Sequence, residues 1–209
     1  MVLANLITLL RLFLLFAIFV IIDASGLAGH LLALFLTVVL IALDGVDGVI
    51  ARQLKETSEF GAVFDIVVDR IVENCFWVYF AVAGVIPVWI PLVILSRGFF
   101  TDGIRAVALT KGSAAFGEKS LQKSLVGKAL VSSRWSRGLY GLSKVLSFLV
   151  LILLKGMSLP LAEIPLTPAA QAMIKVAGHN VIYFTVAFCI VRAIPVLIES
   201  RPLFSQGKS

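Results

Sequence analysis

The stretch DGVDGVIARQLKETSEFGAVFDIVVD, residues 44–69, places four aspartates at the junction of two strongly apolar runs. The run at 28–50 ends with the first pair of these aspartates, and the run at 62–85 begins with the second pair. Each run is about as long as an α-helix that crosses a bilayer. Because a carboxylate is costly to place in a membrane, acids within such runs indicate function. The stretch therefore predicts a hairpin of two spanning helices that carries a functional acidic site.

The rest of the chain is equally apolar. Of its 209 residues, 60% are hydrophobic and 14% are charged, and the mean hydropathy is +1.05. This composition lies far from that of a soluble domain. Further apolar runs of nearly spanning length lie at 6–22, 87–109, 138–158 and 176–198. The six runs predict an all-α integral membrane protein with six transmembrane helices, forming a single domain over residues 1–209.

Basic residues predict the orientation of these helices. The linker at 110–137 is rich in lysine and arginine, which favours a cytoplasmic location. With six spans, both termini and the acidic site then lie on the cytoplasmic side of the cytoplasmic membrane. The net charge of +6 is typical of orientation and lipid headgroup contact, so no nucleic acid partner is expected. Residues 111–135 predict either a surface-lying amphipathic segment or a plain loop, and residues 1–22 a retained helix rather than a cleaved signal.

The spacing of the four aspartates predicts that they face one another. On a helix, Asp44 and Arg52 fall on one stripe with Asp47 beside it, and Asp65 and Asp69 form a stripe on the next helix. The short connection makes the two helices antiparallel neighbours. Asp44 and Asp69 are therefore expected at the same depth, each about 12 Å from the turn.

Carboxylates that converge in this way repel one another unless cations neutralise them. Ligation by oxygen alone is typical of Mg²⁺, Mn²⁺ or Ca²⁺. Arg52 at the mouth adds a forked donor suited to phosphate, and the small residues Gly48, Ala51 and Gly61 allow close helix approach or room for a ligand. The sequence predicts that the six helices enclose a polar site near the cytoplasmic face, with one or two divalent ions and phosphoryl-transfer chemistry.

The same residues match the pattern D-x2-D-G-x2-A-R-x8-G-x3-D-x3-D, and the stretch resembles the signature of the CDP-alcohol phosphotransferase (CDP-alcohol phosphatidyltransferase) family. All eight fixed positions are filled, by Asp44, Asp47, Gly48, Ala51, Arg52, Gly61, Asp65 and Asp69. The opening NLITLLR at 5–11 and the six spans are also similar to that family. The signature covers the second and third runs, and the rest of the chain agrees in architecture.

The resemblance implies metal-dependent transfer of a phosphatidyl group from CDP-diacylglycerol to the hydroxyl of a small polar acceptor, with release of CMP, in phospholipid biosynthesis. It implies Mg²⁺ or Mn²⁺ as cofactor, with Asp44, Asp47 and Asp65 as ligands. Asp69 would be a ligand that also acts as general base on the acceptor. The nucleotide would contact Gly48, Ala51, Arg52, Gly61, Asn5 and Thr8, although helix packing also explains the last two. A homodimer in contact with membrane lipids is implied as well.

Basic residues of the fourth and fifth runs bear on the acceptor. Arg97 and Arg105 fall on one helix face, with Asp102 three residues from Arg105, while Arg134 and Arg137 follow the basic linker. One interpretation is that Asp102 pairs with an arginine and the other cations only set orientation. The other is that the four arginines form an anion pocket for a phosphorylated acceptor.

Phosphatidylglycerophosphate synthases are the family members that this chain resembles best, which favours glycerol 3-phosphate as acceptor. Inositol phosphate, inositol and serine are the alternatives. Acids within a membrane are also typical of cation or proton-coupled transporters. The enzyme is favoured over a transporter because the acids cluster in one hairpin at one membrane face, without an internal repeat.

Overall fold

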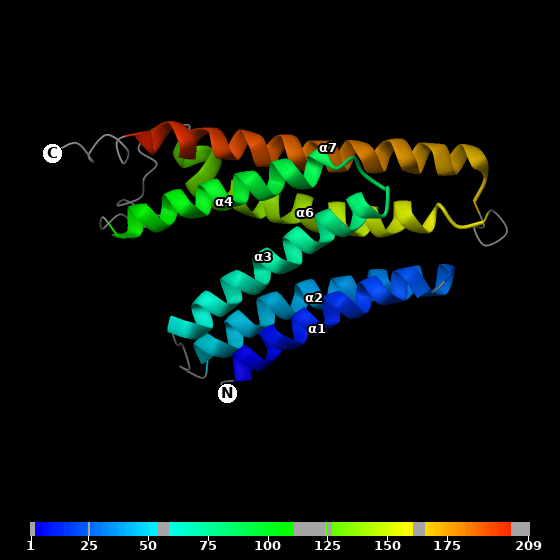
Figure 1. Ribbon diagram of the computed structural model, residues 1–209, viewed down its shortest axis with the longest axis horizontal. Coiled ribbons are helices and arrows are strands. Elements are labelled where there is room, and N and C mark those ends of the chain that lie inside the picture. The colour runs from blue at the N-terminus through cyan, green and yellow to red at the C-terminus, as the bar shows by residue number, and fades with distance from the viewer. Residues whose placement is uncertain are drawn as a thin grey trace. The chain divides into compact units, whose positions relative to one another are not determined.

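The computed structural model is all-helical over the residues that it describes, which are 3–24, 26–53, 59–110, 124, 127–160 and 166–201 (Figure 1). The side chains of 46–53 are not among those described. The helices are α1 (Leu3–Ala24), α2 (Leu27–Gln53), α3 (Glu59–Val82), α4 (Trp89–Thr110), the π-helix η1 (Lys128–Ser132), α6 (Arg134–Gly156) and α7 (Pro168–Glu199). The all-α prediction is confirmed for this part of the chain.

Four of the described helices are long and apolar enough to cross a membrane, over Asn5–Ala24, Leu27–Gly45, Arg134–Gly156 and Pro168–Glu199. This agrees with the predicted membrane class. The other two long helices are less apolar because charged residues interrupt them, among them Asp65 and Asp69 in α3 and Arg97 and Arg105 in α4. The count of six spans therefore stays a prediction.

The chain divides into two compact units. The first unit holds Met1–Val88 and Phe148–Gly178, and the second holds Trp89–Ser147 and His179–Ser209. Helices α6 and α7 each contribute to both units, because the division falls within them. The prediction of one domain over 1–209 stays a prediction.

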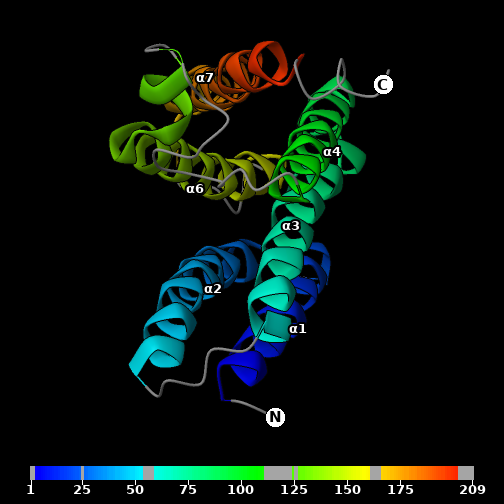
Figure 2. The ribbon, with the colours of Figure 1, turned by 90° about the vertical axis from the view of Figure 1, so that its left-hand side faces the viewer.

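In the first unit, α1 packs against both α2 and α3 (Figure 2). Aromatic side chains fix the C-terminal half of α3, where Phe76 stacks on Phe148 of α6 with ring centroids 4.5 Å apart and Trp77 meets the same ring edge-on at 5.6 Å. Phe76 and Trp77 are fully buried. Inside a membrane such close packing is a main source of helix association. It holds α3 in place, including the turn that carries the acids.

The pair α1 and α3 is also tied by polar contacts. The Tyr79 hydroxyl donates a hydrogen bond of 2.7 Å to Oδ1 of Asp23, and Phe19 stacks on the Tyr79 ring at 4.3 Å. Arg11 lies twelve residues before Asp23 on the same helix, about 18 Å along its axis. As described below, Arg11 contacts the other half of α3. Two separated contacts therefore fix the register of α1 on α3.

In the second unit, hydroxyl groups join α6 to α7. Ser147 Oγ donates to Thr185 Oγ1 at 2.9 Å, and Thr185 Oγ1 lies 3.1 Å from the carbonyl oxygen of Ser143. The short helix η1 has a widened π turn, closed by a 2.8 Å bond from the amide of Ser133 to the carbonyl of Lys128. Such turns are frequent at functional sites.

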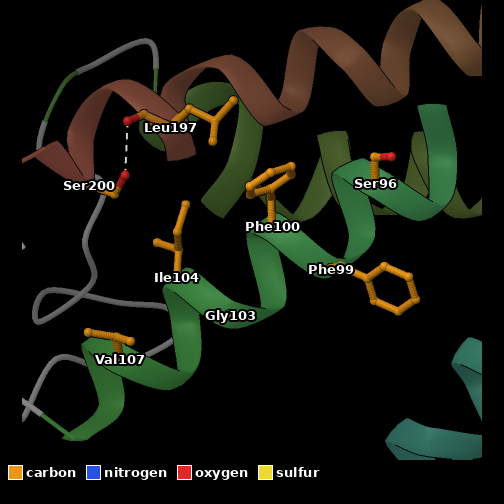
Figure 3. A pocket seen from close by; sticks show the side chains of 8 residues that line it. All are labelled: Ser96, Phe99, Phe100, Gly103, Ile104, Val107, Leu197 and Ser200. Carbon is orange, nitrogen blue, oxygen red and sulfur yellow. Dashed lines mark hydrogen bonds between the residues drawn. The ribbon is translucent and has the colours of Figure 1, made fainter. Parts of the chain in front are cut away.

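A groove of about 660 Å³ lies between α4 and α7 in the second unit (Figure 3). Its walls include Phe99, Phe100, Ile104 and Leu197, with Ser200 near one end. Most of this lining is apolar, so the groove offers no cluster of ligands for a metal ion or a phosphate among the described residues.

Candidate metal centre

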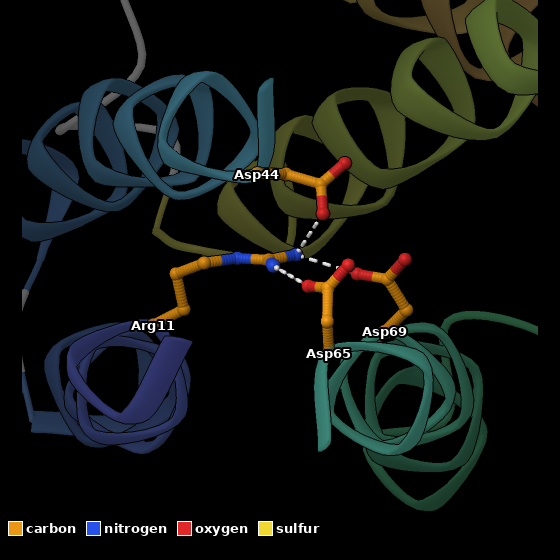
Figure 4. Close-up of polar contacts among 4 residues, drawn as sticks. All are labelled: Arg11, Asp44, Asp65 and Asp69. Atoms are coloured by element: carbon orange, nitrogen blue, oxygen red, sulfur yellow. Dashed lines mark hydrogen bonds and ion pairs between the residues drawn. The ribbon is translucent and has the colours of Figure 1, made fainter. Parts of the chain in front are cut away.

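Three of the four predicted acids converge in the first unit. Asp44 of α2 and Asp65 and Asp69 of α3 each offer a carboxylate oxygen, and these oxygens lie within 4.8 Å of one another. Figure 4 shows the three side chains pointing toward one another from the two helices. Asp47 belongs to the helical backbone of α2, but its side chain lies outside those described. The expected convergence is therefore observed for three acids, while their role as metal ligands stays a prediction.

Local sequence explains this convergence. Asp65 and Asp69 are four residues apart in α3, so both carboxylates lie on one face of the helix. Helix α2 continues without a break through Asp44 to Gln53, and its backbone groups there bond within the helix. The carboxylate oxygens are consequently the main ligand atoms that these turns can offer.

Arg11 of α1 lies between the three carboxylates (Figure 4). Its Nη2 lies 2.6 Å from Oδ1 of Asp44 and 2.7 Å from Oδ1 of Asp69, and its Nη1 lies 3.2 Å from Oδ1 of Asp65. Hydrogen bonds between charged groups of this kind are shorter and stronger than neutral ones. The Arg11 side chain is only 3% exposed, whereas those of the three acids are 42 to 48% exposed. The guanidinium is therefore buried, and the carboxylates remain accessible.

Arg11 is not among the site residues predicted from the sequence. Its position did contain a signal, because an arginine inside the apolar run at 6–22 is costly to leave without an acidic partner. The acids of residues 44–69 lie in the next two apolar runs and are natural partners. Matching the positive charge of Arg11 to the acids of these runs would thus have predicted Arg11 as part of the site.

The residues present fit a hard divalent cation. Among the described side chains, the cluster offers only carboxylate oxygens, which are the ligands that Mg²⁺ and Mn²⁺ prefer. Arg11 contacts one oxygen of each acid, and Figure 4 shows the second oxygen of Asp44 and of Asp69 directed away from the guanidinium. Asp44, Asp65 and Asp69 could therefore hold an ion on the accessible side of the cluster.

The predicted nucleotide contacts are described only in part. Thr8 is buried and precedes Arg11 by one helical turn on α1, and Asn5 is half-buried one turn earlier. Gly61 is half-buried near the start of α3. Gly48, Ala51 and Arg52 belong to α2, but the burial of Gly48 and the side chains of Ala51 and Arg52 lie outside the described set. Nucleotide binding by these residues stays a prediction.

The second unit gathers three cations around one tyrosine. Arg97 of α4, Lys144 of α6 and Arg192 of α7 lie over the Tyr140 ring, at 5.6, 5.0 and 5.2 Å from its centroid. The negative face of an aromatic ring attracts cations at this distance. We call these three cations and Tyr140 the Tyr140 cluster. The cluster therefore concentrates positive charge at one place in the second unit.

Arg192 was not predicted, although it belongs to the Tyr140 cluster. It is 5% exposed, and its Nη1 donates to the carbonyl oxygen of Leu130 in η1 at 2.7 Å and to Oγ of Ser136. The Nε atoms of Arg97 and Arg192 are buried without a hydrogen-bond partner among the described residues. Buried donors of this kind ordinarily find a partner. The cluster thus retains donor capacity for an anionic ligand.

The predicted acceptor residues are placed differently from one another. Arg97 belongs to the Tyr140 cluster. Nη1 of Arg105 lies 3.8 Å from Oδ1 of Asp102, which is the pairing expected if the other cations only set orientation. Arg134 is exposed in the first turn of α6, and Arg137 is half-buried in the same turn. Of the four arginines, Arg97 has the clearest geometry for an anion pocket.

The chain is similar in sequence to known proteins. The family model for CDP-alcohol phosphatidyltransferase matches residues 1–191. A CDP-diacylglycerol–glycerol-3-phosphate 3-phosphatidyltransferase of Bacillus subtilis (strain 168) is 31% identical over 90 residues, which are 43% of this chain and 47% of the relative. A putative cardiolipin synthase of Mycobacterium tuberculosis (strain H37Rv) is 34% identical over 86 residues, 41% of this chain and 39% of the relative.

A probable phosphatidylglycerophosphate synthase of the same strain is 27% identical over 113 residues, 53% of this chain and 54% of the relative. The chain thus spans about half or less of the length of the curated relatives that it matches. The family match is broader, because residues 1–191 include α1 to α4 and all of α6, with Arg11 and the three converging acids. On this match, the chain belongs to the CDP-alcohol phosphatidyltransferase family.

Proposed function

We propose that this protein transfers a phosphatidyl group from CDP-diacylglycerol to the hydroxyl of a small polar acceptor, with glycerol 3-phosphate favoured. The observation that carries the proposal is the convergence of Asp44, Asp65 and Asp69 within 4.8 Å in a chain of this family. The name of the Bacillus subtilis relative states the same donor and acceptor for that protein. This reaction would be a step of phospholipid biosynthesis.

The chemistry follows from the residues of the cluster. A divalent ion held by Asp44, Asp65 and Asp69 would withdraw charge from the donor diphosphate and stabilise the departing CMP. The acceptor oxygen attacks the phosphorus that bears the diacylglycerol, and the bond from this phosphorus to CMP breaks. Asp69 takes the hydroxyl proton as general base. Its carboxylate is 48% exposed, which leaves it accessible to an acceptor that enters from the aqueous side.

The Tyr140 cluster is the proposed binding site for the acceptor phosphate. A phosphate fits several converging cations, and a guanidinium can donate two parallel hydrogen bonds to it. Arg97 and Arg192 each have a buried Nε without a partner among the described residues. Glycerol 3-phosphate and inositol phosphate carry the required anion, whereas inositol does not. Serine offers only a carboxylate.

We further propose six spans, a homodimer, and a site that faces the cytoplasm. The basic linker at 110–137 supports this orientation. A cation or proton-coupled transporter is the alternative from another class. Membership of the phosphatidyltransferase family favours the enzyme.

Release of CMP tests the proposal. The purified protein is incubated with CDP-diacylglycerol, Mg²⁺ or Mn²⁺, and in turn glycerol 3-phosphate, inositol phosphate, inositol or serine. We expect release with glycerol 3-phosphate and its loss in excess chelator. Release with only another acceptor would revise the acceptor, full turnover in chelator would refute metal dependence, and absence of release with every acceptor would refute the function.

A further inference from the structure

Arg11 contacts all three of the acids that could hold a metal ion. Its guanidinium contacts one oxygen of each of Asp44, Asp65 and Asp69 at 2.6 to 3.2 Å. A metal ion held by these three acids would draw on the same three carboxylates, even if it bound their other oxygens. Two cations held by the same carboxylates oppose each other's binding, because each weakens the negative potential that attracts the other.

Arg70 of α3 provides a comparison within the same unit. Its Nη1 lies 3.4 Å from Oε2 of Glu73, three residues later on the same helix. Arg11 instead reaches from α1 to acids on two other helices, and all three contacts, at 2.6 to 3.2 Å, are shorter than that between Arg70 and Glu73. An arginine that served only to neutralise one acid would not need contacts to three.

We propose that Arg11 is a displaceable counter-ion that couples metal binding to binding of the CDP donor, an inference that rests on the function proposed above. Without ligands, its guanidinium satisfies the three carboxylates. A metal ion on the carboxylates would weaken their attraction for the guanidinium, which could then turn to a ligand beside the site. A forked donor of this kind fits a diphosphate, which the donor carries.

This arrangement makes metal and donor bind cooperatively. A diphosphate that accepts the guanidinium removes a competing cation from the carboxylates and so raises their affinity for the metal. By linkage, the metal raises the affinity for the donor by the same factor. Removal of the guanidinium should have two effects at once: tighter metal binding without donor, and weaker coupling between the two ligands.

The experiment measures binding of Mn²⁺ to the purified full-length protein by electron paramagnetic resonance of the free ion, without turnover, in the presence and absence of saturating CDP. Because CDP also binds Mn²⁺ in solution, that binding is measured separately and subtracted. In the wild type we expect CDP to tighten Mn²⁺ binding by about fivefold or more. In Arg11→Met we expect Mn²⁺ to bind about tenfold more tightly without CDP, and the effect of CDP to fall to about half of the wild-type effect or less, because only direct attraction between metal and diphosphate remains.

Two further variants sharpen the test. Arg70→Met removes an arginine of the same unit that contacts Glu73, and it should keep the wild-type affinity and the wild-type effect of CDP. Arg11→Lys keeps the charge but loses the fork, so both quantities should lie between those of the wild type and Arg11→Met. If Arg11→Met does not fold, as judged by gel filtration and thermal unfolding, the comparison of Arg11→Lys with the wild type decides the matter.

Unchanged or weaker Mn²⁺ binding by Arg11→Met without CDP would show that Arg11 organises the acids and does not compete, which overturns the proposal. An unchanged effect of CDP would also overturn it. Release of CMP by the same preparations separates this inference from the function. Metal-dependent turnover with an unaltered Mn²⁺ affinity in Arg11→Met would refute the inference alone, and the expected binding changes without turnover on any acceptor would refute the function alone.

Discussion

At the scale of single residues, two acids that contact the same nitrogen of Arg11 have different proposed roles. Oδ1 of Asp44 and Oδ1 of Asp69 lie 2.6 and 2.7 Å from Nη2. Asp44 lies within α2 after a long apolar stretch, while Asp69 is four residues from Asp65 and is the most exposed of the three acids. In the proposed function, Asp44 is a metal ligand and Asp69 also removes a proton.

Replacement of each acid by asparagine distinguishes the two roles. Asp69→Asn should lower kcat by roughly 100-fold with little change in binding of CDP-diacylglycerol, because an amide cannot accept the hydroxyl proton. Asp44→Asn should lose activity through weaker metal binding, which a higher Mg²⁺ or Mn²⁺ concentration offsets by mass action. Titration of both variants with metal makes the comparison, and recovery of Asp69→Asn to near the wild-type rate would exclude it as an obligatory base.

The Tyr140 cluster gives a second prediction at this scale. Arg192→Met should raise KM for glycerol 3-phosphate by about tenfold and leave KM for CDP-diacylglycerol nearly unchanged, since a charged hydrogen bond contributes about 1.5–3 kcal/mol. Arg201→Met is the matched control, because Arg201 is exposed and belongs to no proposed site. Steady-state kinetics with each substrate varied in turn tests this, and equal shifts in both variants would remove Arg192 from the acceptor site.

How far these residues could be predicted depends on sequence separation. Asp65 and Asp69 are one turn apart, and a short connection joins them to Asp44, so helical geometry alone brings them together. Arg11 is 54 and 58 residues away from its two partners on α3. Spacing within a helix does not determine which distant helix packs beside it. Only the opposite charges of Arg11 and the aspartates indicate this contact in the sequence. Arg192 was missed for the same reason.

At the scale of helices, the apolar runs predicted the six long helices that the structure describes, but not all of their ends. The run at 176–198 belongs to α7, which begins eight residues earlier at Pro168. Proline is favoured at the first position of a helix, and the alanines that follow are strong helix formers, although they add little to an apolar run. Helix α3 ends at Val82, just before Gly84, whose φ of +74° suits glycine and breaks the helix.

Close packing of α6 and α7 in the first unit gives a prediction at this scale. A Cβ at Gly178 would lie 2.9 Å from Cγ1 of Val150, so the helices approach there because glycine has no side chain. Gly178→Val should lower stability by about 1–3 kcal/mol through overpacking. In Gly141→Val, the same change falls where a Cβ meets nothing within 4 Å. Thermal unfolding in detergent compares the two, and equal midpoints would contradict this packing.

At the scale of the whole molecule, the distribution of charge and the chemistry of the site should agree. The proposed donor, CDP-diacylglycerol, would carry its diphosphate at the level of the lipid headgroups, with its acyl chains in the bilayer. Acids at the ends of apolar runs, together with a buried arginine, suit a reaction at that boundary. The lysines and arginines of the linker at 110–137 predict that this boundary lies on the cytoplasmic side.

Orientation can be tested by labelling single cysteines in a variant that lacks Cys75 and Cys189. We expect cysteines at Ser120 and Ser209 to react with a membrane-impermeant maleimide only after the cells are opened, because positively charged linkers remain in the cytoplasm.

Leu166, exposed just before α7, should lie on the other side, since one span separates it from the basic linker. A cysteine there should react in intact cells. This control shows that the reagent reaches the outer face, so the absence of labelling at Ser120 and Ser209 in intact cells indicates that these positions lie inside. Labelling of Ser120→Cys from outside would reverse the orientation and place the acids on the outer face. Labelling at Ser209 alone would mean an odd number of spans.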